Sequence, residues 1–259
     1  MRRTALIALS CLALAACQPD GEEDAEVPRI AVAQLGTAVW PPPELSSTVE
    51  TPQVIDRFAQ NNMIVLDMSG SMGEYDCAGS HANRAGAAKA ALLAWLRANP
   101  GDNTGLVSFS ADGVRLDMRL GRGQSHAEAM VERIESLRPD NSTPLLSAMQ
   151  RASAELEAQA ARQGGTGAYR MIVITDGEAS SGEEPGPLLQ AIADNPANMI
   201  EIHTIGFCIE GGHSLNDPGR VFYTDANSPE ALRAGLEATQ GEAAAFDDAD
   251  FESLEELMP

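Results

Sequence analysis

Short apolar runs alternate with helical stretches through the middle of this chain, and this alternation constrains the fold more than any other feature. The runs Met63–Leu66 and Met171–Ile174 are continuously apolar, which is typical of parallel strands covered on both faces. Met199–Phe207 is a third, half-apolar run. Strands that alternate with helices predict an α/β fold, with a doubly wound, mostly parallel sheet and helices on both of its faces.

Turn and capping signals add one hairpin and five helices to this sheet. Leu106–Phe109 and Val114–Met118 flank the turn signal Asp112-Gly113, which predicts a hairpin at one side of the sheet. We expect five helices, at residues 83–98, 125–137, 143–162, 187–193 and 228–239. The capping box Ser125–Glu128 opens the second, and Thr143-Pro144 opens the third, with Pro144 as its first helical residue.

Polar side chains follow the predicted strands. The segment DMSGSM places Asp67, Ser69 and Ser71 directly after the first strand. Asp176 follows the second, and Thr143 stands where a connection becomes a helix. In doubly wound sheets, ligands bind in the crevice beyond the carboxyl ends of the strands. We therefore expect these five side chains to converge at that edge.

Two carboxylates and three hydroxyls form a set of hard oxygen ligands. Such a set suits a hexacoordinate Mg²⁺ that keeps some of its waters, or else Mn²⁺ or Ca²⁺. As a helix N-cap, Thr143 can turn its hydroxyl to the ion. The alternative is that Asp67 and Asp176 only cap turns and helices. Glu74 and Asp76 lie just downstream, and we expect solvated loop acids there rather than a second cation site.

These motifs resemble those of von Willebrand factor type A domains. DMSGSM resembles the DxSxS motif of that family, Asn141-Ser142-Thr143-Pro144-Leu145 its threonine loop, and Ile174-Thr175-Asp176-Gly177 its second aspartate loop. A D-x-S-x-S match arises by chance in roughly one chain in twenty of this length, so the order and spacing of all three matter. The likeness covers roughly residues 59 to 240. It implies a metal-ion-dependent adhesion site formed by Asp67, Ser69, Ser71, Thr143 and Asp176.

The amino-terminal residues, MRRTALIALSCLALAAC, have the pattern of an export signal. Two arginines precede about 13 uncharged residues, too few for a membrane span of roughly 20. The stretch Leu14 to Cys17 resembles a bacterial lipobox, which implies that residues 1–16 are removed and that Cys17 is lipidated. Gln18 follows, which implies delivery to the outer membrane, with a periplasmic or surface-facing domain held by acyl chains. The alternative is an ordinary secretory signal with an incidental cysteine.

Two cysteines then remain in an exported, oxidising context. Cys77 follows the metal motif and Cys208 follows the strand Met199–Phe207, so a disulfide between them would brace the metal-bearing edge. The alternative is two free thiols. His213 is near the same edge, where we expect a surface loop histidine, and the other histidines form no cluster.

Composition and charge describe the rest of the chain. We expect a flexible tether containing proline and glutamate at 17–54, one domain at 55–240, and an acidic tail at 241–259. The formal charge of -21 argues against nucleic acid as a partner, because phosphates need a basic surface. The tail is expected to be solvated. A further hypothesis has Glu252, Glu255 or Glu256 occupying the open position on the metal.

Three functions fit these features. The favoured one is a membrane-anchored, metal-dependent binding module whose cation captures an aspartate or glutamate of a partner protein. The second is a metal-dependent hydrolase of the cell envelope. However, no Ser-His-Asp set, G-x-S-x-G elbow or second metal cluster is visible, so we do not expect an enzyme. The third is a structural envelope lipoprotein whose ion serves only stability.

Overall fold

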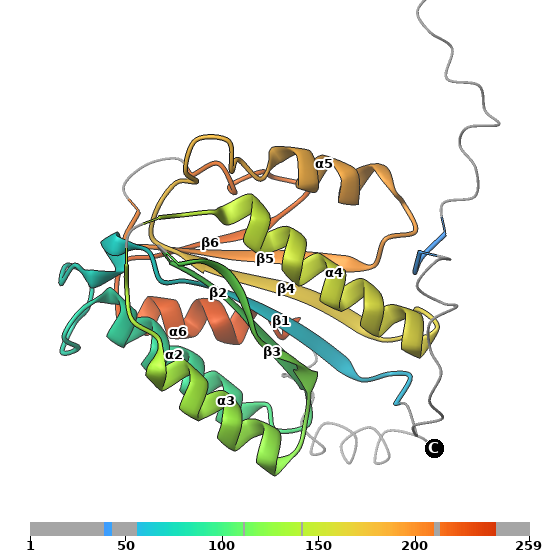
Figure 1. The fold of residues 1–259 in the computed structure, drawn as a ribbon, viewed down its shortest axis with the longest axis horizontal. Helices are drawn as coiled ribbons and strands as arrows, with labels where there is room; N and C mark the ends of the chain where they lie inside the picture. The colour runs from blue at the N-terminus through green and yellow to red at the C-terminus, as the bar shows by residue number, and fades with distance from the viewer. Residues whose placement is uncertain (1–38, 43–55, 111, 141, 210–212, 242–259) are drawn as a thin grey trace, which may run out of the picture. The chain divides into compact units, whose positions relative to one another are not determined.

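The computed structural model describes residues 39–42, 56–110, 112–140, 142–209 and 213–241. Within them, six strands form one sheet in the order β3-β2-β1-β4-β5-β6 (Figure 1). Its strands are β1 (Gln60–Asp67), β2 (Asn103–Ser110), β3 (Gly113–Gly121), β4 (Ala168–Thr175), β5 (Ile200–Phe207) and β6 (Phe222–Ala226). All neighbouring pairs are parallel except β2 and β3. The predicted fold class is confirmed.

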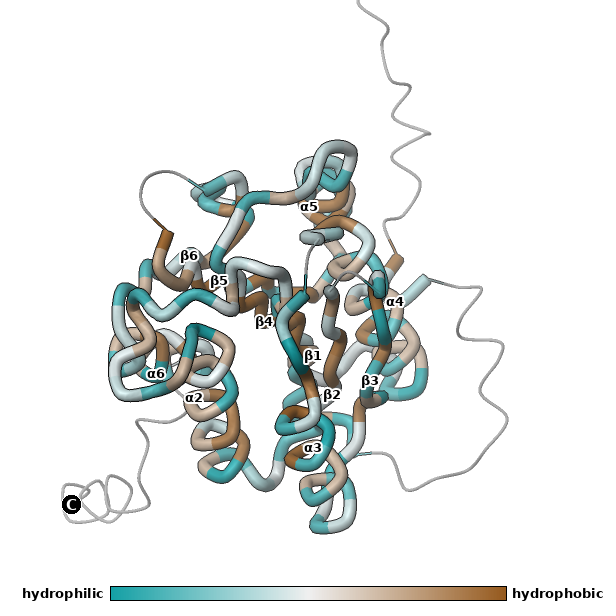
Figure 2. Tube along the Cα trace, turned by 60° about the vertical axis from the view of Figure 1, so that its left-hand side comes forward, coloured by the Kyte–Doolittle hydropathy of each residue, from teal (hydrophilic) through white to brown (hydrophobic). Residues whose placement is uncertain are grey.

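Helices cover both faces of the sheet, as expected. One face carries α2 (Arg84–Ala98), α3 (Gln124–Ser136) and α6 (Pro229–Ala238), and the other carries α4 (Leu145–Gln163) and α5 (Gly186–Asp194) (Figure 1). Strand β1 supplies both cores, because successive side chains point to opposite faces. Ile64 and Leu66 pack in the first core, and Met63 and Val65 pack in the second. Figure 2 shows this as brown central strands enclosed between the helices.

Local capping explains where two of the helices begin. Asn83 accepts a hydrogen bond from Gly86 N at 2.8 Å at the start of α2, and Ser228 accepts one from Ala231 N at 3.2 Å at the start of α6. At the far end of α4, Gly164 adopts a left-handed conformation with φ of 66°, which glycine accommodates without steric cost.

Two predicted helix starts are wrong in detail. Gly123 is the N-cap of α3, so Ser125 and Glu128 lie inside the helix and form no capping box. Instead, Gln124 donates to Glu128 at 2.9 Å. Helix α4 begins at Leu145, which makes Pro144 rather than Thr143 its N-cap residue. The physical reason is that a residue distant in sequence, Glu183, accepts hydrogen bonds from two of the first amides of α4, one through its backbone carbonyl and one through its side chain.

Strand β6 was not predicted. It has only five residues, lies at an edge of the sheet, and carries Phe222 with 63% of its surface exposed. A short edge strand lacks the continuous apolar run and the turn signals by which the central strands are recognised. Its residues pair with β5 in parallel, from His203↔Phe222 to Phe207↔Ala226.

Part of the segment expected to be a tether contacts the domain. Trp40 packs edge-on against Tyr169 with ring centroids 5.9 Å apart, and Pro41 is buried. The predicted signal peptide at 1–16, Cys17, residues 18–38 and 43–54 of the tether and residues 242–259 of the tail lie outside the described residues. None of the helices in the described ranges is long and apolar enough to cross a membrane.

Candidate metal site

The carboxyl ends of β1 and β4 bring the two motif aspartates to one edge of the sheet. These strands are neighbours, and Leu66 is in register with Ile174. Asp67 is the last residue of β1, and Asp176 comes directly after β4. Parallel strands end at the same edge, so this pairing places residues more than 100 positions apart in sequence side by side.

Asp67 is fully buried and carries hydrogen bonds on both carboxylate oxygens. Oδ1 accepts from the backbone N–H of Ser69 at 2.7 Å, and Oδ2 accepts from the Thr175 hydroxyl at 2.7 Å. Burial, together with the nearby charge of Asp176, raises the pKa of Asp67 to about 6. In the part of the chain that the structure describes, no lysine or arginine contacts Asp67. A buried carboxylate in this setting favours a nearby cation.

The two motif serines connect to Asp176. Gly70–Gly73 forms a short 3₁₀ helix, η2, with Ser69 at its N-cap. The hydroxyl oxygens of Ser69 and Ser71 lie 3.1 Å apart, and the Ser71 hydroxyl donates to Asp176 Oδ1 at 2.7 Å. We call Asp67, Ser69, Ser71 and Asp176 the strand-end cluster. Side-chain hydrogen bonds join Ser69, Ser71 and Asp176. The Asp67 carboxylate is joined to this group by the backbone N–H of Ser69.

Thr143 lies in the loop that bridges the other two motif segments. This loop is held to the first motif, because Asp140 N donates to Met68 O at 2.8 Å. It is held to the segment after β4 by Ser180, whose hydroxyl accepts from Thr143 N at 3.1 Å and whose N–H donates to Thr143 O at 3.0 Å. No hydrogen bond joins the half-buried Thr143 side chain to the strand-end cluster, all of whose residues are described.

Glu183 caps α4 in place of Thr143. Its Oε2 accepts from Ser147 N at 2.8 Å, its Oε1 accepts from the Ser147 hydroxyl at 2.9 Å, and its carbonyl accepts from Leu146 N at 3.0 Å. The Thr143 hydroxyl is therefore not needed for capping and remains available as a ligand.

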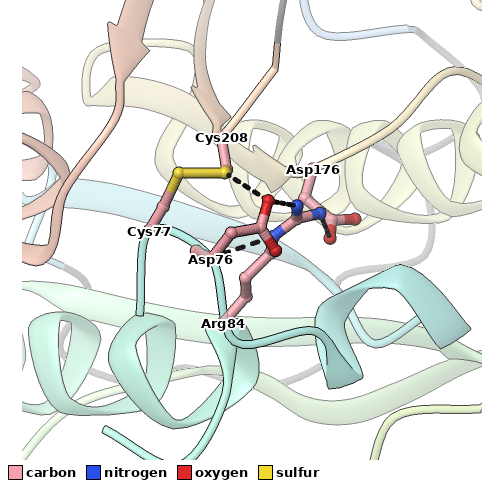
Figure 3. Close-up of a disulfide and its surroundings, with 5 residues drawn as sticks. All are labelled: Asp76, Cys77, Arg84, Asp176 and Cys208. Atoms are coloured by element: carbon pink, nitrogen blue, oxygen red, sulfur yellow. Dashed lines mark hydrogen bonds and ion pairs between the residues drawn. A yellow bond between two sulfur atoms is a disulfide. The ribbon is translucent and has the colours of Figure 1, made fainter. Parts of the chain in front are cut away.

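Arg84 is the principal site residue that sequence reasoning missed. Its Nη1 donates to Asp176 Oδ2 at 2.9 Å, and its Nη2 donates to Asp76 Oδ2 (Figure 3). The hydrogen bond from Arg84 lowers the pKa of Asp76. The only available sequence signal was the position of Arg84 at the start of α2. Because Asp76 pairs with Arg84, it is not a free loop acid.

The predicted disulfide is confirmed. Cys77 and Cys208 are bonded with their Cα atoms 5.8 Å apart, and both adopt positive φ, 58° and 59°. The bond connects the loop after η2 to the end of β5 (Figure 3). Asp76 lies beside these two sulfurs, but disulfide sulfurs are not thiolates and do not act as metal ligands in this state.

His213 is not a surface histidine, contrary to expectation. It is 5% exposed; its Nε2 lies 2.9 Å from Gly177 O, and its Nδ1 accepts from Leu215 N at 2.9 Å. These contacts require a neutral ring with the proton on Nε2. His213 is buried because the loop before β6, which carries it, packs against the segment after β4, which contains Gly177. Neither segment's own sequence indicates this contact. Thr175, which orients Asp67, was also missed.

The residues present fit a hard divalent cation. The strand-end cluster gathers two carboxylates and two hydroxyls at one edge, with the Thr143 loop bound to both motif segments. Oxygen ligands of this kind suit Mg²⁺, Mn²⁺ or Ca²⁺ rather than a thiophilic metal.

This mostly parallel sheet, with helices on both faces and polar residues beyond its central strands, defines a doubly wound α/β domain. Residues 62–178 match the family model of the von Willebrand factor type A domain. The chain therefore contains a von Willebrand factor type A domain. No curated protein sequence is significantly similar to it.

Solved structures share this fold. The pilus adhesin SpaC from Lactobacillus rhamnosus GG superimposes with a TM-score of 0.54 at 19% identity, over 72% of this chain and 30% of that chain. A von Willebrand factor type A protein from Catenulispora acidiphila gives 0.53 at 17%, over 71% and 42%. The SpRpn10 VWA domain gives 0.50 at 17%, over 69% and 94%. This chain thus spans less than half of the first two proteins, and the likeness shows the fold alone.

Proposed function

We propose that this chain is a protein-binding module that depends on a divalent cation. Asp67, Ser69, Ser71, Thr143 and Asp176 would hold the ion, which we propose to be Mg²⁺, with Mn²⁺ or Ca²⁺ as alternatives. The observation that carries the proposal is the strand-end cluster at the carboxyl edge of a von Willebrand factor type A fold. The similarity to a pilus adhesin is consistent with it.

The chemistry of the cluster favours capture of a carboxylate. When bound, a Mg²⁺ ion held by two carboxylates and neutral hydroxyls offers an exchangeable coordination position that an aspartate or glutamate of a partner can occupy. Asp67 and Asp176 supply the negative charge. The hydroxyls orient the carboxylate oxygens and add no further negative charge. We propose binding rather than catalysis, because His213, the histidine beside Gly177, already uses both ring nitrogens and is not available as a base.

The proposal includes attachment to a bacterial envelope through lipid on Cys17. Acyl chains would hold the domain at the bilayer, with the outer membrane as the expected location. Metabolic labelling with a fatty acid tests this part. Wild-type protein should incorporate label and a Cys17→Ser variant should not, whereas labelling of the variant would exclude Cys17 as the acceptor.

Binding measurements with matched variants test the metal-dependent part. Purified protein should bind Mg²⁺ in a calorimetric titration, and immobilised protein should retain envelope proteins in Mg²⁺ but not in chelator. Asp67→Ala and Thr143→Ala should lose both signals and stay folded. Asp194→Ala, an exposed aspartate that precedes β5 at the opposite edge of the sheet, should keep both. Chelator-resistant capture that is equal in all variants would contradict the proposal.

A further inference from the structure

Arg84 lies between two carboxylates that differ in their surroundings. Asp176 is fully buried at its side chain, whereas the side chain of Asp76 is 61% exposed. The guanidinium contacts both through separate nitrogens, with only 10% of its own side chain exposed (Figure 3). Arg84 Nε also approaches the backbone carbonyl of Asp76 at 3.4 Å. One cation is thus shared between a carboxylate of the proposed metal site and one outside it.

Helix stability does not explain this position. Arg84 is the first residue of α2, where the partial positive charge of the helix N-terminus disfavours a basic side chain. Asn83 already caps the helix through its own side chain. The two carboxylates, rather than the helix, therefore determine where the guanidinium lies.

Both oxygens of Asp176 have partners in this arrangement. Oδ1 accepts from Ser71 and Oδ2 accepts from Arg84. A divalent cation at the strand-end cluster must draw on the same carboxylate, and it is repelled by a guanidinium bonded to that carboxylate. The arginine and the ion therefore compete for the negative charge of Asp176.

Asp76 offers the guanidinium a second partner that remains when the ion binds. It is adjacent to Cys77, and its Oδ2 lies 3.3 Å from Cys208 Sγ, so the disulfide fixes the segment that carries it. The carboxylate is thereby kept beside Arg84 although it is largely exposed.

We propose that Arg84 is an internal counter-ion of the metal site, which competes with the divalent cation for Asp176, and that Asp76 retains the guanidinium when the cation binds. This inference rests on the proposed function. It makes Arg84 and Asp76 positioning residues that set the affinity for the ion without ligating it.

Two substitutions should move the affinity in opposite directions. In calorimetric titrations with Mg²⁺ alone, Arg84→Gln should raise the affinity by about tenfold, because a positive charge next to the ion is removed. Asp76→Asn should lower it by about threefold, because Arg84 then relies on Asp176; the smaller size reflects the exposure of Asp76. The melting temperature of the metal-free protein should fall in Arg84→Gln, which leaves Asp176 buried and unpaired.

Arg133→Gln is the matched control. Arg133 Nε donates to Asp117 at 2.7 Å, and the side chain of Asp117 is only 1% exposed, so this variant also strips an arginine from a buried aspartate, on the edge strand β3. It should lower the melting temperature without changing the Mg²⁺ affinity. Because the Asp76 side chain is largely exposed, the Asp76→Asn variant should fold even if Arg84→Gln does not. Weaker Mg²⁺ binding by Asp76→Asn then supports the inference.

The outcomes separate this inference from the function on which it rests. Wild-type binding with unchanged or weaker affinity in Arg84→Gln, or with unchanged affinity in Asp76→Asn, overturns the role of Arg84 and leaves the metal site standing. Folded protein that binds no Mg²⁺ in the wild type or in either variant overturns both. Binding by Arg84→Gln but not by the wild type supports the competition directly.

Discussion

At the residue scale, two hydrogen bonds fix the orientation of the buried Asp67 carboxylate. The Ser69 N–H and the Thr175 hydroxyl each engage one oxygen. Each oxygen can still accept a second partner, which is what a ligand to a cation needs. The contact from Thr175 comes from the neighbouring strand, so the sheet itself aligns one motif with the other.

Replacing Thr175 with valine should destabilise the protein by about 1 to 3 kcal/mol in urea unfolding. Valine keeps the shape of threonine but cannot donate, which leaves Asp67 Oδ2 buried without that partner. Thr204 on the adjacent strand β5 is the matched control. It is equally buried, and its hydroxyl has no hydrogen-bond partner among the described residues. Thr204→Val should therefore be neutral or stabilising, and equal losses in the two variants would contradict this account.

At the element scale, helix starts were predictable only where the capping group is local. Asn83 and Ser228 cap helices that begin directly after them, and these starts follow from the sequence. The start of α4 does not, because its cap is Glu183, which lies 36 residues from Ser147 along the chain. Strand β6 was missed for a related reason, since its pairing with β5 rather than its own short pattern defines it.

Glu183→Ala should lower the free energy of unfolding by about 1 to 2 kcal/mol. The substitution removes the acceptor for the Ser147 N–H and a negative charge at the N-terminus of α4, where negative charge is favourable. Glu184→Ala is the control, because Glu184 is exposed and, among the residues that the structure describes, its side chain accepts a hydrogen bond only from the nearby Gly182 N–H. Chemical denaturation compares the two, and a Glu183→Ala protein as stable as the Glu184→Ala protein would exclude the capping role.

At the scale of the whole molecule, the sequence predicted the sheet apart from β6, and the convergence of the motif aspartates and serines, because strand ends and polar motifs are encoded locally. It did not predict Arg84 or Thr175 as neighbours of the site, and it placed His213 near this edge without predicting its burial or its contacts. Their contacts join segments 36 to 108 residues apart, and nothing in the local pattern distinguishes them from ordinary helix, strand and loop residues. Geometry supplied by the packed fold was needed to find them.

The disulfide should stabilise the whole domain, because it closes a loop between residues 131 positions apart and joins the metal-motif segment to the end of β5. A Cys77→Ser, Cys208→Ser double variant should lose about 2 to 5 kcal/mol in urea unfolding, chiefly because the unfolded chain gains entropy when the cross-link is absent. Reductant should destabilise the wild type by a similar amount and leave the double variant unchanged. The loss should also loosen Asp76 beside Arg84, so the double variant should bind Mg²⁺ more weakly, as Asp76→Asn does. A variant that matches the wild type in stability would show that the packing of the sheet, rather than the cross-link, holds these two segments together.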